Sequence, residues 1–195
     1  MNQLVPTRPV IVRPVAAAAP TRFDAVSIAL HWTTVPLLAA LFASAWSIGL
    51  AQDAADAAGR LTLHRSLGVL LWLLALARLG WRLGFATRPP LPDSLPGPQR
   101  LAAAATEAAL YLILLIQPVT GLAQSLTRGR PFQLFAAQVP AVMARDKALT
   151  HLLHEIHERG AWLLLGLIGL HLSAALFHRL VLKDRVLQSM LPGRE

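Results

Sequence analysis

The stretch HERGAWLLLGLIGLH, residues 157–171, decides how this chain folds. It belongs to a run without charged side chains between Arg159 and Arg179, which is long enough for a membrane-spanning helix. His157 and His171 are fourteen residues apart, so a helix places them on about the same face, roughly 21 Å apart along its axis. An imidazole in lipid is costly unless its polar atoms are satisfied. Two of them at opposite ends of one helix therefore predict two cofactors stacked across the bilayer.

The composition indicates a membrane protein. The chain has 195 residues, enough for one domain, of which 55% are hydrophobic and only 14% charged. The net charge of +8 is spread between and beside long apolar runs, so we expect it to set membrane topology and not to bind nucleic acid. The chain has no cysteine, which excludes disulfides, iron–sulfur clusters and covalently attached haem, and leaves histidine as the metal ligand.

Apolar segments separated by polar or proline-rich stretches predict four spans and an all-α fold, an integral membrane four-helix bundle with two haems stacked across the bilayer. We place the spans at about residues 25–50, 61–84, 101–126 and 152–181. We expect this domain, residues 23–188, to lie between a flexible cytoplasmic N-terminal tail, 1–22, and a cytoplasmic C-terminal tail, 189–195. The longest connection, residues 128–150, is predicted to contain a short surface helix.

Lysine and arginine predict the orientation. Of the chain's 18 basic residues, eleven lie on the side of the two tails and the second loop, and seven on the other side. The smaller group is further diluted by five acidic residues. Because basic residues are retained in the cytoplasm, we expect a multi-pass protein of a bacterial inner membrane with both termini cytoplasmic.

Topology then pairs four histidines. His31 starts the first span and His171 ends the fourth, so both lie near the cytoplasmic face. His64 starts the second span and His157 starts the fourth, both from the opposite face. Each pair is suited to the two axial positions of a haem iron. A haem held by two imidazoles has no open coordination position, so it passes electrons and does not bind oxygen.

The alternative to ligation is a hydrogen-bonded structural role, which suits any one histidine equally well. Four histidines at two matched depths favour ligation. His151 and His154 lie in a polar region and are expected to be solvated, although a proton relay or substitute ligand role stays open for His154. His178, close to the basic exit of the fourth span, is expected to face lipid head groups.

Two glycines and three arginines accompany the histidines. Gly68 and Gly160 follow His64 and His157 at about one turn, where a missing side chain lets a flat macrocycle approach; small residues are also common in helix contacts within membranes. Arg65, Arg78 and Arg82 could pair with haem propionates or a quinone carbonyl. The alternative is that these arginines mark the membrane boundary.

The ordered set of motifs resembles a known family, the bacterial cytochrome b561 proteins, related to the cytochrome b subunits of nickel–iron hydrogenases. The matching pieces cover all four spans and are SIALHW (27–32), HRSLG (64–68), RLGWR (78–82), residues 111–118 with Gly121, RGRP (128–131), His157 with Glu158, GLHLSAALFH (169–178), Lys183 with Asp184, and MLP (190–192). The terminal pieces in particular make the set specific.

The resemblance implies two b-type haems ligated by His31, His64, His157 and His171, and electron exchange with ubiquinone in the respiratory chain. In characterised members it also implies oxidation of superoxide at the periplasmic face, to which Arg128 and Arg130 would attract the anion. Our hypothesis is a superoxide:quinone oxidoreductase-like protein surrounded by membrane lipid. The alternative is a non-catalytic electron-transfer subunit that anchors a periplasmic dehydrogenase or cytochrome as its redox partner.

Overall fold

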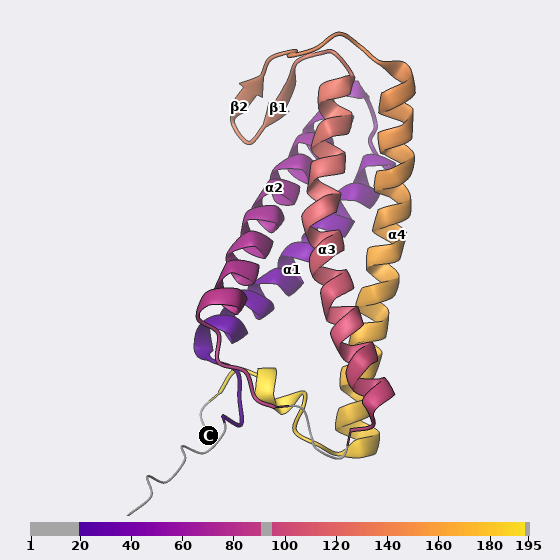
Figure 1. Ribbon diagram of the computed structural model, residues 1–195. Coiled ribbons are helices and arrows are strands. Elements are labelled where there is room, and N and C mark those ends of the chain that lie inside the picture. The colour runs from indigo at the N-terminus through magenta and orange to yellow at the C-terminus, as the bar shows by residue number, and fades with distance from the viewer. Residues whose placement is uncertain (1–19, 91–94, 194–195) are drawn as a thin grey trace, which may run out of the picture.

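The computed structural model describes residues 20–90 and 95–193. Within them, four long helices run up and down as a bundle (Figure 1). They are α1 (Ala25–Ile48), α2 (Ala54–Gly84), α3 (Gly97–Thr127) and α4 (Lys147–Phe177). Four short elements complete the description: the strands β1 (Phe132–Leu134) and β2 (Ala137–Val139) of an antiparallel hairpin, a π-helical turn after α4 (His178–Leu182), and a 3-10 turn (Gln188–Met190).

The two ends of the bundle differ. The β1–β2 hairpin projects beside the last turns of α3 and the start of α2, and we call this the hairpin end (Figure 1). The first residues of α1 and the last described residues lie together at the other end, which we call the termini end. Helix α3 packs on both α2 and α4, and α1 packs on α2.

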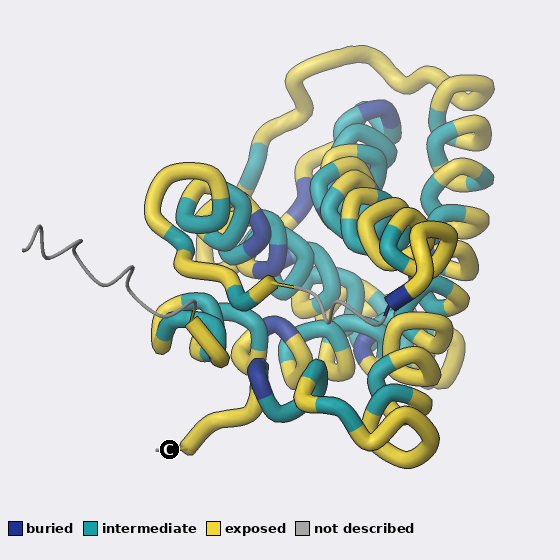
Figure 2. Tube along the Cα trace, turned by 60° about the horizontal axis from the view of Figure 1, so that its bottom comes forward, coloured by how far each residue is buried: buried dark blue, intermediate teal, exposed yellow. Residues whose placement is uncertain are grey.

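The helices are apolar on their outer surfaces. All four are long and apolar enough to cross a membrane, with mean hydropathies of 1.7, 1.5, 1.6 and 1.8. Large side chains such as Trp46 and Trp162 are more than 60% exposed, and few positions are buried (Figure 2). The small interior cluster consists of Leu71, Ala75, Leu114 and Leu164. A surface of this kind is stable in lipid, so the predicted all-α membrane four-helix bundle is confirmed.

Two helices begin before the spans expected from hydropathy because aspartates cap them. The Asp53 carboxylate accepts a hydrogen bond from the Asp56 amide at 2.8 Å, so α2 includes a polar turn before the apolar segment. The Asp146 carboxylate does the same for the Leu149 amide at 2.9 Å, and α4 starts at Lys147. The polar first turns of α2 and α4 both belong to the hairpin end.

The prediction of a short surface helix between α3 and α4 is wrong. That connection forms the β1–β2 hairpin, whose tip residue Phe135 has a positive φ of 53°. The Phe135 amide donates to Ser66 Oγ of α2 at 2.8 Å. Phe132 is buried beneath the Arg65 guanidinium, 4.8 Å from the ring centroid. The hairpin is thereby held on α2.

The terminal segments were predicted to be tails. Residues 1–19 and 194–195 lie outside the described residues, but residues 189–193 dock against the start of α1. The Arg22 guanidinium donates to the carbonyls of Leu191 and of Gly193, the latter at 2.7 Å. Trp32 Nε1 donates to the Met190 carbonyl at 2.7 Å. The MLP motif therefore closes the termini end of the bundle.

Candidate functional site

At the termini end, α1 and α4 bring two imidazoles close together. The ring centroids of His31 and His171 are 6.3 Å apart, with their planes at 62°. The edge of the His31 ring also contacts Trp32, with centroids 5.5 Å apart. Nδ1 of His31 is buried and has no hydrogen-bond partner among the described residues. We call His31 and His171 the termini-end pair.

At the hairpin end, α2 and α4 form a second pair. The ring centroids of His64 and His157 are 6.2 Å apart, with their planes at 89°. This hairpin-end pair is better anchored than the other one. Nδ1 of His64 lies 3.1 Å from Ser44 Oγ, and Nδ1 of His157 lies 3.0 Å from Thr120 Oγ1.

The hydroxyl groups fix the protons of these two rings. Ser44 donates its own hydroxyl proton to the Leu41 carbonyl at 2.7 Å, so its oxygen can only accept from Nδ1–H of His64. Thr120 likewise donates to the Gln117 carbonyl at 2.8 Å and accepts from His157. The proton of each neutral imidazole is then on Nδ1, and Nε2 keeps a free lone pair for a metal.

The two pairs fit haem iron by distance and by ligand number. A metal bonded at about 2 Å to one nitrogen of each imidazole holds the two ring centroids about 6 Å apart, as they are at both sites. Among the described residues, no group of three or more histidines, cysteines or acids could hold a metal. Two facing imidazoles alone suit a metal whose other ligands come from a macrocycle.

A cavity of about 1030 Å³ surrounds the hairpin-end pair. Its lining includes Gly68 and is mostly apolar, and a Cβ on Gly68 would meet only one atom, of Leu41, at 4.0 Å. Gly68 therefore leaves space that a flat apolar group can use. Gly160 lies elsewhere, against α3, where a Cβ would come within 2.4 Å of Gln117 Oε1. Because Gly160 has no Cβ, the Gln117 side-chain amide can donate to the His157 carbonyl at 2.8 Å.

A third glycine has a closer relation to the site than the sequence suggested. In the sequence, Gly121 was only one of the residues that match the family. A Cβ at this position would lie 2.9 Å from Cε1 and 3.3 Å from Nδ1 of His157. The His157 ring thus occupies the space that a side chain would fill. The hydroxyls of Ser44 and Thr120 were missed as well, because such residues commonly bond to their own helix backbone and give no signal in the sequence.

Of the two arginines predicted near the end of α2, one is paired with a carboxylate and the other is not. Arg82 forms a bidentate ion pair with Glu107, in which Nη2 donates to Oε2 at 2.8 Å. Both Arg78 and Arg82 lie over the Tyr111 ring, 5.4 and 5.7 Å from its centroid. Arg78 has no carboxylate partner among the described residues, and it acts electrostatically on both imidazoles of the termini-end pair. Arg78 is therefore the cation available to an anionic group there.

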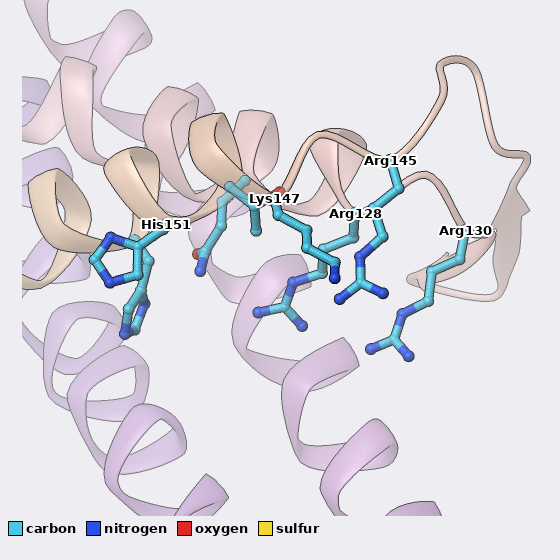
Figure 3. Close-up of a pocket in the computed structure, with 8 residues that line it drawn as sticks. Arg128, Arg130, Arg145, Lys147 and His151 are labelled. Carbon is cyan, nitrogen blue, oxygen red and sulfur yellow. The ribbon is translucent and has the colours of Figure 1, made fainter.

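Three arginines of the hairpin end, Arg65, Arg128 and Arg130, form a cluster. Arg65 Nε donates to Ser125 Oγ at 2.9 Å, while Arg128 and Arg130 are close enough to act on its charge. Burial and the neighbouring charge of Arg130 lower the pKa of Arg128. The side chains of Arg128 and Arg130 point into a basic pocket of about 520 Å³ (Figure 3). The predicted anion-attracting residues are thus gathered at one opening.

The other histidines do not face a second imidazole. His157, and not His154, faces His64. His151 and His154 line the basic pocket, and Nε2 of His154 is 3.8 Å from Glu158. Nδ1 of His178 contacts the Asp184 carboxylate at 2.5 Å.

Comparisons with known proteins place the chain in a family. The family model for prokaryotic cytochrome b561 matches residues 22–193. The chain is 32% identical over 174 residues to cytochrome b561 homolog 2 of Escherichia coli strain K12, covering 88% of this chain and 92% of the relative. Cytochrome b561 homolog 1 of the same strain is 27% identical, with 89% and 99% covered. A probable superoxide oxidase CybB of Yersinia pestis is 28% identical, with 89% and 97% covered.

Proposed function

The chain belongs to the prokaryotic cytochrome b561 family, and on this premise we propose that it is a di-haem cytochrome that passes electrons from superoxide to ubiquinone. The family resemblance inferred from the sequence is thereby confirmed. Membership makes the chain a bacterial membrane electron-transfer protein with b-type haem. The number of haems, the donor, the quinone and the orientation are parts of the proposal.

The observation that carries the proposal is the pair of facing imidazoles at each end of the bundle. Centroid distances of 6.3 and 6.2 Å suit one iron between His31 and His171 and another between His64 and His157. Bound there, b-type haem would supply a reversible one-electron centre. The four imidazoles would hold the two irons, and the Nδ1–H bonds of the hairpin-end pair would orient its two rings.

Other side chains would adjust charge and access. Arg78 would stabilise an anionic group, such as a propionate or a quinone oxygen, beside the termini-end pair. Arg82 is neutralised by Glu107 and would contribute by holding α2 to α3. Arg65 would play the role of Arg78 at the hairpin end, beside Ser125. The apolar lining of the hairpin-end cavity would keep water away from the imidazoles.

Superoxide is the proposed donor because the opening beside the hairpin-end pair is basic. Arg128 and Arg130 would attract a small anion toward the cavity that contains His64 and His157. The name of the Yersinia relative, a probable superoxide oxidase, supports the same substrate. Two superoxide anions would each lose one electron and leave as dioxygen, while one ubiquinone would gain two electrons and two protons. The hairpin end would then be periplasmic and both termini cytoplasmic.

The experiment is to generate superoxide in the presence of the purified, haem-loaded protein in lipid nanodiscs and to follow ubiquinol formation. We expect quinol to form at a rate that superoxide dismutase abolishes and that His64→Ala reduces at least ten-fold. A rate no higher than in empty nanodiscs would refute superoxide as the donor.

The alternative function, an anchor subunit for a periplasmic dehydrogenase or cytochrome, uses the same imidazole pairs with a different donor. It requires a stoichiometric partner in gentle detergent extracts and no superoxide-dependent quinone reduction by the isolated chain. The two assays together separate the two functions.

A further inference from the structure

The basic pocket at the hairpin end collects more positive charge than a monovalent substrate needs. It has a volume of about 520 Å³ and is built from the end of α3, the following connection and the start of α4. The charged groups of Arg128, Arg130, Arg145 and Lys147 come together over it (Figure 3). Its lining is completed by Gln124, Thr150, His151 and His154.

Among the residues that the structure describes, no acidic side chain lines this pocket. The nearby carboxylates are engaged elsewhere: Asp146 caps α4, Glu155 pairs with Arg159 at 2.8 Å, and Glu158 lies 3.8 Å from His154 on the side of the imidazole cavity. None of the four cations has a protein hydrogen bond or ion pair in the part of the chain that the structure describes. Holding four like charges together raises the free energy of the folded chain unless an anion joins them.

We propose that this pocket is a binding site for a multivalent phosphate. A phosphate group offers several oxygens to the guanidinium forks of Arg128, Arg130 and Arg145, and Lys147 adds a point charge. Gln124 adds an uncharged side-chain amide donor. Superoxide has two atoms and one charge, so it neither fills this volume nor balances these cations. The phosphate can be free in solution or belong to the head group of an anionic lipid.

The pocket adjoins the imidazole cavity. Gln124, Arg128, Arg130 and His154 line both. A bound phosphate would therefore lie across the approach to the hairpin-end pair and exclude smaller anions from it. This regulatory consequence depends on the proposed function, whereas phosphate binding depends on the pocket alone.

The test is isothermal titration calorimetry of the haem-loaded full chain in phosphatidylcholine nanodiscs, with pyrophosphate added at constant ionic strength. We expect saturable binding that the double substitution Arg145→Gln with Lys147→Gln weakens roughly ten-fold or more. Arg159→Gln is the matched control, since Arg159 is an exposed cation of α4 at the same end but does not line the pocket. It should change the affinity less than two-fold.

Absence of saturable binding to the wild type, or equal weakening by Arg159→Gln, would overturn the proposal. Each variant is checked by its haem spectrum, and Arg145→Gln alone replaces the double variant if that one fails to fold. Repeating the titration in nanodiscs that contain cardiolipin identifies the source of the phosphate. An apparent affinity for pyrophosphate lower than in phosphatidylcholine nanodiscs identifies the lipid head group as the natural ligand. An unchanged affinity identifies a free anion. The heat signal needs neither superoxide nor quinone. Phosphate binding can therefore be absent while the proposed function stands, and it can be present while the proposed function fails.

Discussion

Substitution of Gly121 by alanine tests the geometry of the hairpin-end pair most sharply. The added Cβ would lie 2.9 Å from Cε1 and 3.3 Å from Nδ1 of His157. Carbon atoms in ordinary contact are about 3.5–4.0 Å apart, so the ring or α3 must move by at least about half an ångström. The ring cannot turn away without losing its hydrogen bonds to Thr120 and to the Gln117 carbonyl, at 3.0 and 3.1 Å.

Overpacking of this kind costs about 1–3 kcal/mol, which corresponds to a loss of roughly five- to 150-fold in haem affinity at this site alone. The assay is pyridine haemochrome quantitation of protein purified at a fixed haem supply. We expect Gly121→Ala to retain one haem per chain and Gly166→Ala to retain two, because a Cβ on Gly166 would meet nothing within 4 Å. Two haems in Gly121→Ala, with an unchanged reduced spectrum, would refute the reasoning.

Three further predictions concern the surroundings of the site. Thr120→Val removes one acceptor of an imidazole proton, which makes the ligand less basic, and should raise the midpoint potential of the hairpin-end haem by roughly 20–40 mV in a redox titration. Arg82→Gln leaves Glu107 without its partner and should lower the free energy of unfolding by about 1 kcal/mol, measured by thermal melting. The double variant with Glu107→Gln should recover most of that loss. A double variant that recovers none of it would contradict the pairing. Burial raises the pKa of Asp184, but hydrogen bonds, chiefly from His178, outweigh it, and the net pKa is lowered from 3.8. The stabilisation from this contact is therefore complete above pH 3.8 and is lost as the pH falls below that value. The melting temperature of the wild type should fall more steeply with acid than that of Asp184→Asn. Parallel curves for the two proteins would contradict this prediction.

The helices and the resemblance could be predicted because apolar run length and histidine spacing depend only on local sequence. The fourteen-residue separation of His157 and His171 already places both on one face of α4, and the structure brings them to His64 and His31. Whether these rings bind iron stays a prediction, as do the roles of the glycines and arginines.

The hairpin could not be predicted because its strands are three residues long and its turn uses a positive φ at Phe135, a residue type that gives no turn signal. The docking of the C-terminal segment was missed for another reason. It depends on backbone carbonyls, such as that of Met190, which accepts from Trp32, and the side-chain sequence carries no information about them. The role of Gly121 was missed because only the packing of α3 on α4 shows that a ring fills its side-chain space.

The most direct test of the account is the haem content of wild type, His157→Ala and His171→Ala, measured by reduced-minus-oxidised visible spectra with pyridine haemochrome quantitation. The account predicts two b-type haems per wild-type chain, with each substitution removing chiefly one of them and leaving the other with its spectrum unchanged. One haem or none in the wild type, or the loss of the same haem in both variants, would contradict two independent imidazole sites.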